Sequence, residues 1–238
     1  MFTNTMGNAM LLLLVPLLSL IMASSTPSTQ ALVQDFCVGD LARGDTPAGY
    51  PCKPEAAVTA DDFSYRGLSA TGPTIEPFNI ALSSAFSPRF PGVNGLGISA
   101  AIVHFGPGGV VPLHSHPGGS ELLFVVEGTL SAGFISSVTN KVYTQTLRKG
   151  DLMVFPQGLL HFQIATGAGA GGNDDNATAP AAVAAAVALS MYSSSNPGLQ
   201  ILDFALFANN LPSDVLSKVS VLDELQIKKL KSLFRGTG

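Results

Sequence analysis

The stretch GGVVPLHSHPGGSELLFVVEG, residues 108–128, decides the fold of this chain. It fits the pattern G-x5-H-x-H-x4-E-x6-G. His114 and His116 are two residues apart, so on a β-strand both side chains point to the same face. The Pro-Gly-Gly sequence at 117–119 predicts a turn, after which the next strand brings Glu121 alongside the two histidines. The stretch therefore predicts a β-hairpin with three potential metal ligands on one face.

A second stretch, GDLMVFPQGLLH at residues 150–161, fits G-x5-P-x-G-x2-H and predicts another turn that delivers His161 to the same place. Three imidazoles and one carboxylate bind a divalent metal, and in six-coordinate geometry they leave two positions open for water or substrate. Open positions are typical of catalytic metal sites. An isolated H-x-H pair is more often a pair of surface or core histidines. The correctly spaced Glu121 and the second stretch favour a metal site instead.

The fourth histidine of the chain, His104, stands outside both patterns. We place it on a strand face opposite Ala101, Val103 and Phe105, and predict that it is not a ligand. No catalytic residue beyond the metal ligands can be assigned from the sequence.

Short apolar runs separated by turn signals surround the two stretches. Without an intervening helical pattern, such runs predict an all-β sandwich or barrel. The expected strands lie at residues 75–82, 96–105, 120–128, 129–136, 141–147, 151–156, 160–165, 183–193 and 201–207.

The beginning of the chain has the composition of an export signal. Residues 1–25 carry no ionisable side chain, and an apolar run at 10–22 is followed by small residues. We interpret residues 1–25 as a secretory signal peptide cleaved near 23–27. A membrane span is the alternative, but it needs about 20 apolar residues, and this run is shorter and contains Pro16.

Residues 26–60 are loop-like and hold both cysteines of the chain, Cys37 and Cys52. In an oxidising compartment a lone pair of cysteines usually forms a disulfide, and we expect one here. Two buried free thiols are the alternative. The segment is therefore interpreted as an N-terminal extension held by a disulfide, ahead of a barrel at residues 61–210.

Residues 211–238 are predicted to be a short C-terminal helical segment. Ser213 is the expected N-cap of a first helix, and Ser220 with Asp223 is the expected capping box of a second. Glu224 and Lys228 form a favourable i,i+4 pair. Leucines 222, 225, 230 and 233 lie near one stripe, which predicts packing against the barrel or a neighbouring subunit rather than a membrane.

The charge composition of the chain bears on which partners it can bind. The 238 residues are 46% hydrophobic and 12% charged, with a net charge of -4 and no Lys/Arg-dense run before the last helix. Nucleic acid is therefore not an expected partner. A low-complexity stretch at 166–186 contains the sequon Asn176-Ala177-Thr178, which predicts a glycosylated surface loop if the sequon is used.

The two His-containing stretches resemble the two cupin motifs in the form found in germins and germin-like proteins. The resemblance extends to residues 34–38, 52–54, 91–97 and 196–198 and covers nearly all of the chain after the signal. It implies a cupin jelly-roll β-barrel that binds manganese, secreted into the plant apoplast or cell wall. It also implies a homohexamer, a trimer of dimers with C-terminal helices in the contacts. The Mn assignment rests on this resemblance, because the same ligands also accept Fe, Zn, Cu or Ni.

Departures from the resemblance bear on the substrate. Oxalate-oxidising germins carry two asparagines that help to hold oxalate, and the matching positions here are Ala101 and Val111. The second motif usually ends in Asn, where this chain has Ala165. Losing each polar partner in a buried site costs about 1–3 kcal/mol, which disfavours oxalate oxidase.

Two classes of function remain from the sequence. The first, which the resemblance implies because some germin-like proteins have this activity, is a superoxide dismutase that produces hydrogen peroxide in defence or wall development. Superoxide needs little besides an open metal position. The second is a non-enzymatic protein that binds a small carboxylate or sugar or acts structurally in the wall. A related cupin family binds auxin through its metal. Whether the chain is an enzyme stays open at this level.

Overall fold

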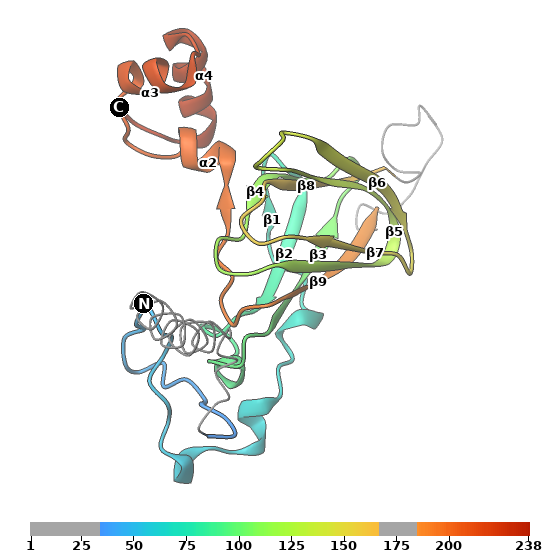
Figure 1. The fold of residues 1–238 in the computed structure, drawn as a ribbon, viewed down its shortest axis with the longest axis vertical. Helices are drawn as coiled ribbons and strands as arrows, with labels where there is room; N and C mark the ends of the chain where they lie inside the picture. Colours follow the sequence, from blue (N-terminus) through green and yellow to red (C-terminus); the bar gives the residue numbers. More distant parts are fainter. Residues whose placement is uncertain (1–33, 167–184) are drawn as a thin grey trace, which may run out of the picture. The chain divides into compact units, whose positions relative to one another are not determined.

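The computed structural model describes residues 34–166 and 185–238 (Figure 1). The chain divides into two units, Met1–Asp35 and Phe36–Gly238, and the second is described below. The predicted signal peptide and Asn176 lie outside the described residues.

The described part of Phe36–Gly238 is mostly β-sheet, as the all-β prediction requires (Figure 1). Its strands are β1 (Thr74–Ile75), β2 (Ile80–Ala85), β3 (Ser99–Phe105), β4 (Val110–Ser115), β5 (Glu121–Ile135), β6 (Val142–Arg148), β7 (Leu152–Phe155), β8 (His161–Ala165), β9 (Ala186–Tyr192) and β10 (Gln200–Ile201). Short 3₁₀ helices lie at Glu55–Ala57, Ala60–Phe63, Gly67–Ser69 and Pro91–Val93.

One long strand, β5, joins the two halves of the barrel. Its first part pairs antiparallel with β7 and β9, and its second part pairs with β6 and β8. The change of partners falls at Gly128, just after an irregularity between Val125 and Glu127. Such bulges bend a strand and increase its twist. The runs predicted at 120–128 and 129–136 are therefore one continuous strand that serves both sheets.

The barrel core follows the alternation expected of half-buried strands. On β3, Ala101, Val103 and Phe105 are buried, whereas His104 is only half-buried on the opposite face, as predicted. Side chains from β5, including Leu123, Val125 and Leu130, complete the cluster around Phe105. The core thus fills the space between the sheets, and its members Ile80, Val103 and Val111 extend it to the metal-ligand cluster.

The chain leaves the barrel through a helix that the sequence did not predict. The strand expected at 201–207 is wrong: β10 ends at Ile201, and α2 (Leu202–Phe207) follows at once. Phe204 packs on Phe78 and on Phe234 of the last helix, and Phe207 is buried. Short apolar runs do not distinguish helix from strand by periodicity, and here contacts with the C-terminal helices decide the outcome.

The C-terminal segment forms α3 (Ser213–Ser220) and α4 (Glu224–Phe234). The predicted caps need correction: Pro212 is the N-cap of α3, and the capping box of α4 joins Asp223 to Gln226 rather than to Ser220.

The apolar face of these helices also differs from the predicted leucine stripe. Leu216 and Ile227 are fully buried together with Phe207, whereas Leu225 and Leu233 are 81% and 58% exposed. The Glu224–Lys228 ion pair is present at 3.1 Å. None of the helices in the described ranges is long and apolar enough to cross a membrane.

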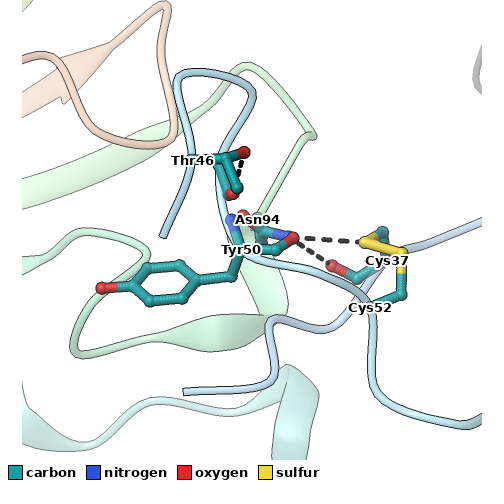
Figure 2. Close-up of a disulfide and its surroundings, with 6 residues drawn as sticks. Cys37, Thr46, Tyr50, Cys52 and Asn94 are labelled. Atoms are coloured by element: carbon teal, nitrogen blue, oxygen red, sulfur yellow. Dashed lines mark hydrogen bonds between the residues drawn. A yellow bond between two sulfur atoms is a disulfide. The ribbon is translucent and has the colours of Figure 1, made fainter. Parts of the chain in front are cut away.

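The N-terminal extension is held by a disulfide and one buried side chain (Figure 2). Cys37 and Cys52 are joined by an S–S bond. The amide of Asn94, 2% exposed, accepts from the Tyr50 N–H at 3.1 Å and donates to the carbonyls of Tyr50 at 2.9 Å and Cys37 at 3.2 Å. Asn94 lies just after the 3₁₀ helix Pro91–Val93, so it ties the extension to the segment that leads into β3.

Candidate metal centre

The four predicted ligands meet inside the barrel, at the ends of three strands. His114 lies on β4 and His116 just beyond it, Glu121 opens β5, and His161 opens β8. His114 and His161 are direct cross-strand neighbours. All four side chains are at most 4% exposed, and one ligand atom from each lies within 4.8 Å of the others.

Backbone carbonyls fix the proton positions on the three imidazoles. Nδ1 of His114 lies 2.9 Å from the Pro112 carbonyl, and Nδ1 of His161 lies 2.8 Å from the Leu159 carbonyl. Nδ1 of His116 contacts the Gly198 carbonyl. A carbonyl only accepts, so each Nδ1 must carry the proton and donate it. In the neutral ring this leaves each Nε2 lone pair free to bind a metal, the arrangement typical of metal-ligating histidines.

The free Nε2 atoms converge on one carboxylate oxygen. Glu121 Oε2 lies 3.0 Å from Nε2 of His116 and 3.1 Å from Nε2 of His161. With Nδ1 protonated, these contacts set lone pairs against lone pairs unless a proton or a metal cation lies between them. His116 Nε2 is buried and has no hydrogen-bond partner. A buried polar atom without a partner is costly, so the cluster fits a bound cation.

The electrostatics of the metal-free cluster agree with this arrangement. Burial, reinforced by the charge of His161, lowers the pKa of His114 to about 3. Burial alone would raise the pKa of Glu121, but the adjacent His116 and His161 side chains outweigh it and hold that pKa below its ordinary value. A neutral imidazole beside an ionised carboxylate is the protonation state that metal binding requires.

Three further side chains surround the ligands. Ser190 on β9 donates a 2.6 Å hydrogen bond to Glu121 Oε1. The Tyr192 ring meets the His116 ring edge-on at 4.7 Å, and burial raises the pKa of its phenol. Phe155 stacks on His161 with ring centroids 4.5 Å apart. These contacts limit the movement of the ligands and exclude water from one side of the cluster.

A cavity of about 50 Å³ opens beside the cluster. Val103 and Val111 line it, whereas Ala101 and Phe105 do not. Gln163 on β8 also lines it, 2% exposed, and its Nε2 has no hydrogen-bond partner. The other lining residues are Ile75, Phe78, Ile80, Leu82, Phe86, His114, His116, Glu121, Ser190, Tyr192, Leu199 and Ile201. The arrangement offers a small, mostly apolar chamber with one free N–H donor next to a potential metal position.

Sequence reasoning missed Gln163, Ser190 and Tyr192. Gln163 lies two residues after His161, so the strand period alone places it on the ligand face. Ser190 and Tyr192 had no such local signal, because their position depends on the pairing of β9 with β5.

The barrel and its buried ligand cluster define the class of protein as a cupin, and the family model for Cupin matches residues 66–171. Within that class the chain belongs to the germin-like proteins. It is 55% identical to Germin-like protein 8-14 of Oryza sativa subsp. japonica, over 89% of this chain and 91% of that protein. It is 51% identical to Auxin-binding protein ABP19a of Prunus persica, over 88% and 93%.

A solved structure of oxalate oxidase is also similar, with a TM-score of 0.73 and 32% identity over 85% of this chain and 96% of the other. The family and fold expected from the two motifs are thereby confirmed.

Proposed function

We propose that this chain is a manganese superoxide dismutase that converts two superoxide ions and two protons into dioxygen and hydrogen peroxide. The observation that carries the proposal is the buried cluster of three Nε2 lone pairs and one carboxylate oxygen, with a small chamber beside it. One water takes up about 30 Å³ in the liquid, so a chamber of about 50 Å³ has room for only one or two waters. That space suits a diatomic anion better than a ring-sized ligand.

His114, His116, Glu121 and His161 would hold the metal, which supplies the one-electron chemistry by taking an electron from one superoxide and returning it to the next. The barrel itself supplies the surroundings. The valine lining keeps bulk water out, and the free Nε2–H of Gln163 offers a hydrogen bond to an anion in the chamber. Manganese rather than another divalent metal is part of the proposal, and metal analysis of the natively purified protein tests it.

Oxalate is a poorer candidate substrate for this chamber. Val111 lines it and cannot donate a hydrogen bond, and Ala101 does not reach it. Only Gln163 has a free side-chain N–H among the residues described there. We therefore expect little or no peroxide release when oxalate is added to the manganese-loaded protein.

The test compares dismutase activity of manganese-loaded wild type with His114→Ala and His104→Ala, all freed of loose metal by gel filtration. His104 is half-buried away from the cluster and is the matched control. We expect activity in wild type and His104→Ala and a loss of at least tenfold in His114→Ala. Equal activity in all three would refute the proposal.

Binding of a small carboxylate without turnover is the second candidate function. The apolar lining and the 51% identity to a protein named for auxin binding favour it, whereas the small volume of the chamber counts against it. An aromatic carboxylic acid that changes the Mn(II) EPR spectrum of protein lacking dismutase activity would support this candidate. No spectral change up to millimolar concentration would exclude it for that ligand.

The cellular setting is also proposed by analogy with the family resemblance. Residues 1–25 would direct secretion to the apoplast or cell wall, 26–60 would form the disulfide-held extension, 61–210 the barrel, and 211–238 the helices of a homohexamer. The Cys37–Cys52 disulfide and the exposed Leu225 and Leu233 support export and assembly respectively. Mass spectrometry of the secreted protein tests cleavage and glycosylation at Asn176, and light scattering tests the hexamer.

A further inference from the structure

The strand β9 changes character where it passes the ligand cluster. Its inward positions are Ala186, Ala188, Ser190 and Tyr192, all buried. The first two are alanines at 0% exposure, packed in the barrel core. Ser190, at 1% exposure, is the first inward position that carries a polar group. A hydroxyl buried this deeply destabilises the folded protein unless it forms a hydrogen bond.

The partner of Ser190 is a ligand carboxylate. Its Oγ lies 2.6 Å from Glu121 Oε1, and because an ionised carboxylate only accepts, the hydroxyl must donate. Hydrogen bonds to an ionised acceptor at this distance are among the stronger ones in proteins. The two residues are 69 positions apart, so the bond also links β9 to the first residue of β5.

The two oxygens of Glu121 consequently have different roles. Oε1 is engaged by Ser190, whereas Oε2 faces Nε2 of His116 and His161. The carboxylate is therefore oriented to bind a metal through Oε2 alone. The hydrogen bond also draws negative charge toward Oε1, so Glu121 donates less charge to the metal than a free carboxylate would.

We infer that Ser190 is a positioning residue that acts through Glu121 and raises the Mn(III)/Mn(II) reduction potential of the site. The inference deepens the proposed function, since it rests on a redox-active metal in this cluster. The higher oxidation state depends more on ligand charge, so withdrawing charge from Glu121 disfavours Mn(III). Dismutation needs both half-reactions to be favourable, and the potential of the metal decides whether they are.

The test uses the full-length manganese-loaded protein and three variants. Ser190→Ala removes the donor, and Ser190→Thr keeps a hydroxyl. Ser83→Ala is the matched control, because Ser83 is also buried and its Oγ donates a 2.7 Å bond, but to the backbone carbonyl of Ala70. The readouts are the midpoint potential from a redox titration, the zero-field splitting of Mn(II) by EPR, and Mn(II) affinity by competition with a chelator.

Ser190→Ala should lower the midpoint potential by about 59 mV, which is a tenfold shift in the Mn(III)/Mn(II) ratio for a one-electron couple. Because Glu121 then donates more charge to the metal, Mn(II) binding should not weaken, and the zero-field splitting should change. Ser190→Thr and Ser83→Ala should match wild type in all three measurements.

A Ser190→Ala protein with the potential and EPR spectrum of wild type would overturn the inference, whatever its activity. A Ser190→Thr protein shifted as far as Ser190→Ala would also overturn it, because the hydroxyl would then not be the cause. The proposed function fails separately, if wild type lacks dismutase activity. In that case the predicted shift in potential would still support the role of Ser190.

Discussion

The stability of the metal-free protein at acidic pH should report the burial of His114. Burial and the charge of His161 lower the pKa of this side chain from 6.5 to about 3. Between pH 6.5 and pH 3, His114 binds a proton in the unfolded chain but stays neutral in the folded protein. The stability contributed by this group is therefore fully present above pH 6.5 and is lost as the pH falls toward 3.

The size of the effect follows from the two pKa values. Between pH 6.5 and pH 3 each pH unit costs about 1.4 kcal/mol, so the free energy of unfolding should fall by about 2 kcal/mol from pH 7 to pH 5. Glu121 does not contribute in this window. Its pKa is lowered from 4.5, so its own contribution is lost only at more acidic pH.

Urea unfolding of chelator-treated protein at pH 5, 6 and 7 measures this slope. His114→Gln should reduce the pH dependence of the free energy of unfolding by the amount expected for about one bound proton. His104→Gln should keep the wild-type pH dependence, because His104 lies on the face of β3 that points away from the core. An unchanged slope in His114→Gln would refute the assignment of the effect to this side chain. A flattened slope in His104→Gln would refute it as well, since that residue lies outside the cluster.

Three further predictions concern stability. Asn94→Ala removes the hydrogen bonds that this side chain makes with Tyr50 and Cys37 of the N-terminal extension (Figure 2), and should cost about 3 kcal/mol, or a drop of about 6–12 °C in Tm. A drop below about 2 °C would contradict this prediction. Val221 ends α3 at φ 56° and is 99% exposed, so Val221→Gly should raise the free energy of unfolding by about 1 kcal/mol in urea, and a loss would contradict it. Manganese at 100 times its Kd should stabilise the protein by about 2.7 kcal/mol, an effect that chelator and His161→Ala should each abolish in thermal melts.

The ligand cluster and the barrel could be predicted because their signals are local. His114, His116 and Glu121 lie within one hairpin, and two spacings, of two and five residues, set their common face. His161 follows a turn whose proline and glycine are visible in the sequence. The fold that brings these segments together is the one the two motifs imply.

The helices at 213–220 and 224–234 were predicted from the sequence, but α2 (Leu202–Phe207) could not be. Residues 201–207 are apolar in a pattern that either a strand or a helix can use. The outcome depends on Phe204 reaching Phe78 and Phe234, which are 126 and 30 positions away in the chain. The predicted leucine stripe is only partly buried for a related reason. Leu222 and Leu230 pack against the cluster of Phe207, Leu216 and Ile227, whereas Leu225 and Leu233 stay exposed.

The side chains that contact the ligands are positioned by pairing between strands that are far apart in the sequence. Ser190 reaches Glu121 only because β9 lies between β3 and β5, in a register that places Ser190 opposite Leu123. A shift of one residue in that register would turn Ser190 outward and bring Leu189 or Met191 inward. The two motifs thus determine which atoms could bind a metal, whereas the register of β9 determines what those atoms contact. Exchanging inward residues of β9 between germin-like relatives should therefore shift the reduction potential of the bound metal while the ligands stay the same, and a redox titration measures that shift.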